Sequence, residues 1–295
     1  ALHDLDEDGD TEIYVANDGM ANFLYDNQGG HFVERGLQSG TQFSTDGRAR
    51  AGMGVDCADF DRDGLPDIAI GNFAYETSAL FHNLGGGAFA DHTERLGVGA
   101  ASYMRLTFGV KFLDYNNDGW LDLLATNGHV LSNVELVDPA QTWAQPAQVL
   151  RNLQGERFVD VSAELGADLV APMVARVSAV GDFDNDGDLD ALVNTTAGRP
   201  RLLRNDGGNR RHWLTVALTG TRPRDALGAR VSVRSAAGTQ KLQRQSGGSY
   251  LAAHDPRLHF GLGTATSAAV EIVWPDGSTR TLAHVAADQI LQAAQ

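Results

Sequence analysis

One nine-residue pattern, D-x-D-x-D-G-x-x-D, recurs at four places in this chain of 295 residues. The most complete copy spans 182–190, and the others span 4–12, 59–67 and 114–122. So many carboxylates at such close spacing repel one another unless a cation lies between them. The pattern therefore predicts four metal-binding loops.

The spacing suits a hard divalent cation such as Ca²⁺, which takes six to eight oxygen ligands at roughly 2.3–2.6 Å. Side chains at loop positions one, three and five point inward, position seven offers its carbonyl, and the acid at position nine completes the shell. Gly at position six allows a sharp turn with positive φ. The candidate ligands are Asp4, Asp6, Asp8, Asp10, Glu12, Asp59, Asp61, Asp63, Leu65, Asp67, Asp114, Asn116, Asp118, Trp120, Asp122, Asp182, Asp184, Asp186, Asp188 and Asp190.

An EF-hand would need a bidentate Glu at position twelve and flanking helices. Position twelve is apolar in all four copies, and a short apolar run typical of a buried β-strand follows each loop. A metal-free surface turn is the alternative for any single copy. Four copies in register favour metal loops between strands.

The loops begin at residues 4, 59, 114 and 182, so they are 55, 55 and 68 residues apart. A repeat of this length is typical of propellers or strand arrays. A strand before each later loop, a strand after it and a following hairpin with Asn and Gly in its turn predict four strands per unit, as in a propeller blade. The expected hairpins lie at 23–33, 79–90, 149–159 and from 202 onward. The longer interval places an insertion of about 13 residues within 127–147, which is a candidate binding loop or a tolerated excursion.

From about residue 210 the metal loops stop and alternating strands such as 212–218 begin, which predicts a sandwich-like all-β domain over 210–295 after the repeats of 1–209. This tail holds ten Arg and Lys against five Asp and Glu, although the whole chain has a net charge of −15. Its arginines could form a polyanion or nucleic-acid surface, but docking on the acidic loops or a solvated face is favoured because the chain is acidic and aromatic residues are sparse. These arginines are Arg210, Arg211, Arg222, Arg224, Arg230 and Arg234.

No catalytic signature is recognisable in the sequence: G-x-S-x-G, P-loop, H-E-x-x-H and dinucleotide-binding motifs do not occur. Paired loop acids could serve a glycan lyase or hydrolase, but metal ligation explains them better.

Cys57 is expected to be a buried thiol and His129 to stabilise a turn. The sequence contains no run of 18 apolar residues, so it predicts no membrane-spanning helix. The chain begins within a metal loop without an initiator Met or signal peptide, so a piece of a longer polypeptide is expected.

The repeats resemble FG-GAP or VCBS repeats, the calcium-carrying blades of integrin α-subunit propellers. Gly181 to Asp190 matches their G-D-x-D-x-D-G-D-x-D loop, and Asn83 to Phe89 matches their N-x-G-x-G-x-F hairpin with small changes. The order of repeats and tail is similar to ASPIC/UnbV-type proteins, which are related to cartilage acidic protein. The tail segments that carry this resemblance are 228–231, 247–250, 259–263 and 274–277.

The resemblance implies an all-β fold with blades from a ring of about seven, followed by a small β domain. It also implies up to four Ca²⁺ ions in a bacterial protein that is secreted, periplasmic or on the cell surface. The implied role is non-catalytic adhesion or interaction with a protein or glycan partner, and nucleic acid is not expected. Two positions depart from the family pattern, because Glu12 replaces Asp and neutral Asn116 weakens the 114–122 site.

Overall fold

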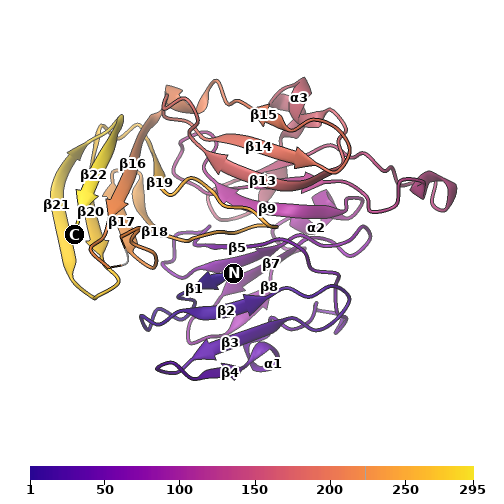
Figure 1. Ribbon diagram of the computed structural model, residues 1–295, viewed down its shortest axis with the longest axis horizontal. Coiled ribbons are helices and arrows are strands. Elements are labelled where there is room, and N and C mark those ends of the chain that lie inside the picture. Colours follow the sequence, from indigo (N-terminus) through magenta and orange to yellow (C-terminus); the bar gives the residue numbers. More distant parts are fainter. Residues whose placement is uncertain (223) are drawn as a thin grey trace.

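The computed structural model describes residues 1–222 and 224–295, and it is built almost entirely of β-strands (Figure 1). Four small antiparallel sheets, here called blades one to four, follow one another along the chain, and each is formed by consecutive strands. Blade one contains β1 (Leu2–His3), β2 (Glu12–Val15), β3 (Phe23–Asn27) and β4 (Phe32–Glu34); blade two contains β5 (Val55–Ala58), β6 (Asp67–Ile70), β7 (Ala79–Asn83) and β8 (Phe89–Asp91); blade three contains β9 (Thr107–Leu113), β10 (Asp122–Asn127), β11 (Gln148–Asn152) and β12 (Phe158–Asp160); and blade four contains β13 (Ala175–Gly181), β14 (Asp190–Thr195) and β15 (Arg201–Leu203).

The apolar run after each predicted metal loop forms the second strand of its blade. Every residue of β6 and of β10 is buried, as expected for strands with apolar side chains on both faces. Each of these strands pairs antiparallel with the strand before the loop and with the first strand of the hairpin. The loop therefore links the first two strands of its blade, which we call its inner strands.

Blade four departs from the four-strand expectation. The chain after β15 was expected to return as a hairpin strand, but in the described residues β15 pairs with β14 alone. The 3₁₀ helix η3 (Gly208–Arg210) follows instead, and the Gly207 and Asn209 N–H groups donate to Asp188 Oδ2. These bonds turn the chain toward the tail, so no fourth strand forms.

Apolar side chains pack between consecutive blades. One cluster joins Leu5 and Tyr14 of blade one to Ile68 and Phe81 of blade two. Similar clusters join blade two to blade three and blade three to blade four. The residue at loop position two supplies part of this packing, since Leu5 and Phe60 are each 1% exposed. Phe183 holds the same position in blade four and is 69% exposed.

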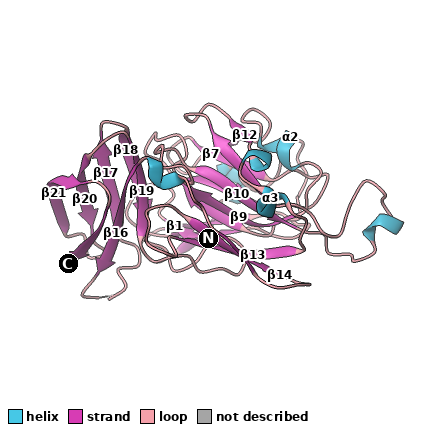
Figure 2. Ribbon diagram, turned by 90° about the horizontal axis from the view of Figure 1, so that it is seen from above, coloured by secondary structure: helices cyan, strands magenta, loops and turns pink. Residues whose placement is uncertain are grey.

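The helices are short and lie in connections between strands: α1 (Gly36–Ser39), α2 (Val98–Ser102), η1 (Val134–Leu136), η2 (Ser162–Glu164) and α3 (Ala167–Val170). No helix among the described residues has both the length and the apolar character that crossing a membrane requires. The predicted insertion lies between β10 and β11 and carries η1. Figures 1 and 2 show it projecting away from the blades, at the end opposite the C-terminal strands.

The C-terminal strands form two sheets that pack on a shared core, which we call the tail domain. One sheet has the order β19 (Leu258–Gly263), β16 (His212–Thr219), β22 (Gln289–Ala294), and the other has the order β18 (Gly238–Gln243), β17 (Arg230–Ser235), β20 (Ser267–Val273), β21 (Thr279–Ala286). Strands β21 and β22 were not expected from the sequence. Strand β22 pairs parallel with β16, and the core includes Val231, Phe260 and Trp274.

The segment between β18 and β19 of the tail domain passes over the first strands of three blades. The Ser249 N–H donates to the Val55 carbonyl, and the Val110 N–H donates to Ser249 Oγ at 2.9 Å. Farther along, the Asp255 N–H donates to the carbonyl of Val180 at 2.9 Å. The segment from Ser249 to Asp255 thus touches β5, β9 and β13 in turn, so it ties the tail domain to three blades.

The hairpin asparagines join each blade to the one before it. Asn152 Nδ2 donates to the Phe60 carbonyl in blade two and to the Leu121 carbonyl in its own blade, each at 2.9 Å. Asn83 and Asn205 make the corresponding bonds, to carbonyls at position two of the preceding loop and at position eight of their own loop. Because each acceptor is a backbone carbonyl, these hydrogen bonds do not depend on which side chain stands at those positions.

We expect Asn152→Ala to lower the free energy of unfolding by about 2–4 kcal/mol, because it leaves two carbonyls without their donor and buried groups lose about 1–3 kcal/mol each. Asn27→Ala is the matched control, since Asn27 Nδ2 reaches only the Thr11 carbonyl of its own blade among the described residues. Its expected cost is about 1 kcal/mol. Urea unfolding measures both, and equal losses would contradict a bridge between blades.

Candidate metal centres

The four loops share one backbone conformation. Position four is left-handed in every copy, with φ of 63° at Glu7, 64° at Arg62, 54° at Asn117 and 60° at Asn185. Position six is the expected glycine with positive φ, for example 96° at Gly187. These two left-handed positions turn the chain so that the acids at positions one, three, five and nine can face one another.

The acids at positions one and nine also hold the loop itself. Asp59 Oδ2 accepts the Gly64 N–H at 3.0 Å, and Asp67 Oδ2 accepts the Phe60 N–H at 3.1 Å. The other oxygen of Asp67 accepts the N–H of Asn83, at 2.9 Å, from the hairpin. Blades three and four repeat all three bonds. A carboxylate at position nine therefore ties its loop to its hairpin.

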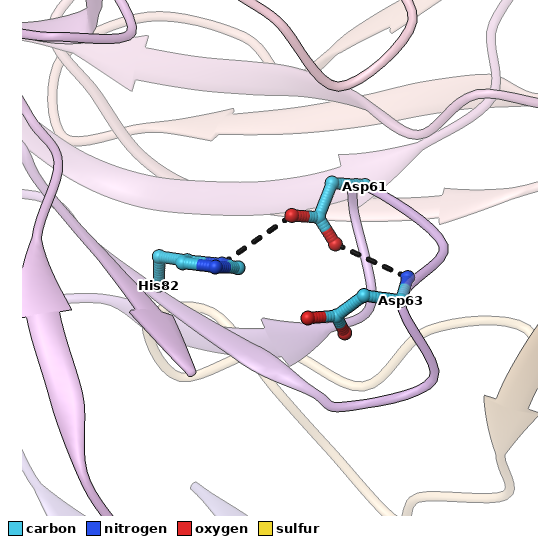
Figure 3. A group of neighbouring side chains, drawn as sticks. All are labelled: Asp61, Asp63 and His82. Atoms are coloured by element: carbon cyan, nitrogen blue, oxygen red, sulfur yellow. Dashed lines mark hydrogen bonds and ion pairs between the residues drawn. The ribbon is translucent and has the colours of Figure 1, made fainter. Parts of the chain in front are cut away.

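Three of the loops bring their acids together as a metal site requires. In each of three groups, one oxygen from every member lies within 4.8 Å of the others. A fourth group replaces one acid with His82 of strand β7 (Figure 3). The groups are Asp4, Asp6 and Asp8; Asp59, Asp61 and Asp67; Asp182, Asp184 and Asp190; and Asp61, Asp63 and His82.

Several buried carboxylate oxygens in these loops have no hydrogen-bond partner. They are Asp4 Oδ1, Glu12 Oε1, Asp59 Oδ1 and Asp188 Oδ1. A buried polar atom without a partner is costly, and more so when the group is charged. A cation bound among these oxygens would compensate them, so the residues of loops one, two and four fit a divalent metal.

Burial raises the pKa of the loop acids in the metal-free chain. The pKa of Glu12 rises to about 7 because its carboxyl is desolvated and neighbouring Asp6 and Asp4 are negative. Asp59 and Asp188 also reach about 7 through burial, and Asp67 reaches about 6. The free energy of ionisation is thus unfavourable without a cation, as expected for a ligand cluster.

The third loop differs, because two arginines contact it. Arg211 Nη1 donates to Asn116 Oδ1 at 2.8 Å and lies 3.7 Å from Asp118 Oδ2. Arg62 donates to the Gly119 carbonyl and stacks on the Trp120 ring, 3.9 Å from its centre. In the described part of the chain, no metal-type group forms from this loop.

Some predicted ligands point to other partners. Asp10 Oδ2 accepts the Gly29 N–H, and Asp188 Oδ2 accepts bonds from the chain that follows β15. At position seven, the Leu65 and Trp120 N–H groups donate to Asp63 and Asp118. Asp10, Glu12, Asp186 and Asp188 belong to none of the groups described above, and those groups contain side chains only, so the Leu65 and Trp120 carbonyls lie outside them. Their part in metal binding stays a prediction.

Position four of every loop reaches the tail domain, which sequence reasoning missed. Glu7 pairs with Lys241 at 2.9 Å, and Arg62 donates to the Ala237 carbonyl at 2.6 Å. The same position supplies Asn117, whose Oδ1 lies 2.7 Å from His259 Nε2, and Asn185, which accepts from Arg257 at 2.5 Å. No spacing rule predicts these contacts, because position four varies in chemistry and its partners lie more than 70 residues away.

Of the six tail arginines considered for polyanion binding, two contact loop acids. Arg230 pairs with Asp4, and Arg211 lies near Asp118. A cavity of about 360 Å³ lies along this junction and is lined by Asp59, Asp114 and Asp182 together with side chains of the tail domain. The acids at position one of loops two, three and four therefore lie at the junction with the tail domain, whereas Asp8, Asp63 and Asp184 in the middle of their loops are exposed.

Two family models match separate stretches of the chain. The model of the FG-GAP-like repeat matches residues 4–70 and 59–125, and the model named ASPIC and UnbV matches residues 219–295. The chain carries FG-GAP-like repeats and an ASPIC and UnbV domain. The repeat model covers the first three of the four loops, and the domain model covers all of the tail strands after β16.

The chain is similar to cartilage acidic protein 1 from three vertebrates. Identity is 27% to the Mus musculus protein over 96% of this chain, and 28% to the Homo sapiens and Xenopus tropicalis proteins over 90% and 96%. It spans about two-fifths of the length of these relatives: 42%, 39% and 43%.

Two solved structures are also similar, each with 15% sequence identity. One is an Agrocybe aegerita lectin described as recognising non-reducing terminal N-acetylglucosamine, with a TM-score of 0.43 over 97% of this chain and 65% of that chain. The other is the V. cholerae biofilm matrix protein Bap1, with a TM-score of 0.32 over 96% of this chain and 57% of that chain.

The raised pKa of Asp59 predicts a pH dependence of stability. An acid whose folded pKa is about 7 contributes stability that is present below its unfolded pKa, near 4, and lost as pH rises through about 7. Without cations, we expect wild type to lose about 2–4 kcal/mol relative to Asp59→Asn between about pH 4 and pH 8. With saturating Ca²⁺, wild type should instead be more stable than Asp59→Asn, since the cation stabilises the ionised carboxylate.

Urea unfolding of both chains across this range measures the difference. Comparison with the variant is needed because buried His3 and His259 and half-buried His254, whose pKa values fall to about 4, lower the stability as pH falls below about 6.5, which is the opposite direction. Parallel stability curves for wild type and Asp59→Asn in metal-free buffer would show that Asp59 does not titrate as a desolvated acid.

Proposed function

We propose that the chain is a non-catalytic, calcium-stabilised interaction module. The observation that carries this is the set of buried carboxylate oxygens without partners, such as Asp4 Oδ1 and Asp59 Oδ1, in loops that link blade to blade and blades to tail. All-oxygen groups in loops one and four suit a hard cation. The cations hold the blades and the tail domain in a fixed arrangement, with one domain over 1–209 and the other over 210–295.

The acids are structural in this proposal, and their contacts support that role over catalysis. Both oxygens of Asp67, Asp122 and Asp190 accept backbone N–H groups. A carboxylate that is tied in this way, or that holds a cation, is not free to transfer protons. The rival proposal, a glycan lyase or hydrolase, requires calcium-dependent turnover of acidic glycans, and its detection would overturn the non-catalytic role.

The projecting insertion is the surface that we propose for partner contact. Leu136 and Val137 at its tip are 84% and 75% exposed, whereas its base is buried, with Gln141 and Gln145 2% and 1% exposed. His129 Nδ1 accepts the Leu131 N–H, which supports the turn role expected for that residue. Exposed apolar side chains on an anchored loop are typical of protein contact sites.

The exposed end of blade four supports the proposal of a larger ring. Phe183 is exposed, whereas Leu5 and Phe60 at the same loop position are covered by the next blade. A further blade with its own hairpin asparagine would cover Phe183 as blade two covers Leu5. We also propose an extracellular or periplasmic setting, where calcium is abundant enough to fill such loops.

Calcium binding is tested by thermal unfolding and calorimetry of the full chain. Because a cation that binds only the folded state adds RT ln(1 + [L]/Kd), about 2.7 kcal/mol per site at a hundredfold excess, we expect EDTA to lower the Tm and Ca²⁺ to restore it. Asp184→Ala should remove one ion and part of the shift. Asp18→Ala is the control, since Asp18 is exposed and outside the loops. An unchanged Tm after full chelation would refute the proposal.

Partner contact is tested with paired variants of the insertion. We expect Leu136→Ser with Val137→Ser to weaken binding to a panel of extracellular-matrix proteins at least tenfold, with the Tm unchanged because both side chains are exposed. Exchange of exposed Leu84, which lies in a hairpin turn, to Ser is the control. Binding that is insensitive to the insertion but sensitive to Leu84 would place the contact elsewhere.

A further inference from the structure

The four blades differ at one position beside the metal loops. The residue immediately before the hairpin asparagine is Asp26 in blade one, His82 in blade two, Arg151 in blade three and Arg204 in blade four. In blade one, the negative charge of Asp26 adds to the burial that raises the pKa of Asp6. In blade three, Arg151 lines the same hollow as Asn116 and Asp118. In blades one and three, this position therefore brings a charged side chain close to the loop, whereas Arg204 in blade four pairs with Asp206 outside the loop.

In blade two that side chain is an imidazole aimed into the loop. His82 Nδ1 lies 3.0 Å from Asp67 Oδ1 and 3.4 Å from Asp61 Oδ2. A ring nitrogen of His82 and oxygens of Asp61 and Asp63 lie within 4.8 Å of one another, and Figure 3 shows the three side chains converging from β7 and from the loop. The ring is held in place by stacking on His92, with 5.0 Å between centres.

A separate observation points to a cation at the same place. Asp59 is 8% exposed, and its Oδ1 is buried without a hydrogen-bond partner. Asp59 forms a second group with Asp61 and Asp67, so the two groups share Asp61. Through Asp61, the group that contains the imidazole nitrogen thus adjoins a group that contains a buried, uncompensated carboxylate oxygen.

We propose that the blade-two loop is a site for a borderline divalent transition metal of the Zn²⁺ class, with a ring nitrogen of His82, Asp61 and Asp63 as ligands. Imidazole suits Zn²⁺ and its neighbours, whereas Ca²⁺ takes oxygen ligands. Loops one and four have no histidine in their groups and keep the preference for calcium. The inference rests on the proposed function in one respect, namely that the loops hold cations.

Isothermal titration calorimetry of Zn²⁺ into the full chain tests the site, with saturating Ca²⁺ present to fill the oxygen sites. Wild type should bind one Zn²⁺ that Ca²⁺ does not displace. His82→Asn should weaken it at least tenfold, because Asn offers a hydrogen-bond donor to Asp67 but no imidazole. His284→Asn, at an exposed position on β21, should leave it unchanged.

A conservative exchange separates ligation from a merely structural role. His82→Asp gives blade two the residue of blade one, so it should lose the Zn²⁺ preference and gain Ca²⁺ affinity. In wild type, the ring nitrogens of His82 should shift in long-range ¹H–¹⁵N spectra when Zn²⁺ is added to calcium-loaded protein, and this readout does not depend on a variant folding.

Two results would overturn the inference: Zn²⁺ binding that survives His82→Asn, or His82 nitrogens that do not respond to Zn²⁺. Either result leaves the calcium proposal intact if Ca²⁺ still raises the Tm. Conversely, if Zn²⁺ binds through His82 but Ca²⁺ does not change the Tm, the result would support this site and refute the calcium-stabilised module.

Discussion

The carboxylate at loop position nine is the constraint on which the blades depend. In blades two, three and four, one of its oxygens accepts the N–H at position two, and the other accepts the N–H of the hairpin asparagine. The asparagine in turn bonds to the preceding blade, so one buried acid couples loop, hairpin and neighbour. Blade one departs from this, because Glu12 accepts the Leu5 N–H at 2.6 Å while its Oε1 has no partner. The longer side chain thus keeps the bond within the loop but leaves the hairpin bond unmade.

The tail domain extends this coupling. Every position-four side chain bonds to it, and the segment 249–255 hydrogen-bonds to three inner strands. These contacts are unequal: Glu7 and Lys241 are partly exposed and contribute little, whereas Asn117 is fully buried and also donates to the Gly187 carbonyl of blade four. Trp213 lies so close to Gly187 that a Cβ there would fall 1.9 Å from its Nε1. Glycine is therefore required at this position by the tail domain as well as by its φ of 96°.

Local patterns could predict the loops, their inner strands, three of the hairpins and the change of character near residue 210. The acids and glycines that build those elements are neighbours in sequence, so spacing alone carries the information. What spacing could not predict depends on distant partners. The missing fourth strand of blade four follows from bonds between Asp188 and the chain after β15, and the role of Arg257 follows from Asn185 across 72 residues. Strand β22 was missed because its partner β16 lies far upstream, and β21 was missed because most of its residues are exposed and give no alternating apolar pattern. The ligand roles of the loop acids remain predictions of the pattern.

Loops with the same sequence pattern can differ as metal sites, because side chains from other parts of the fold change their surroundings. The third copy keeps Asp114, Asp118 and Asp122, but neutral Asn116 admits Arg211, and Arg62 from the preceding loop covers Trp120. Two guanidinium groups can neutralise loop acids as a cation does, although a fixed side chain cannot be removed by chelation. Asp114 is nevertheless desolvated enough to have a pKa of about 7, because Arg62 offsets only part of the repulsion and burial around it. Under the proposed function, the guanidinium groups at the third loop would keep blade three joined to its neighbours without an exchangeable cation, whereas the other loops would depend on the metal in their surroundings.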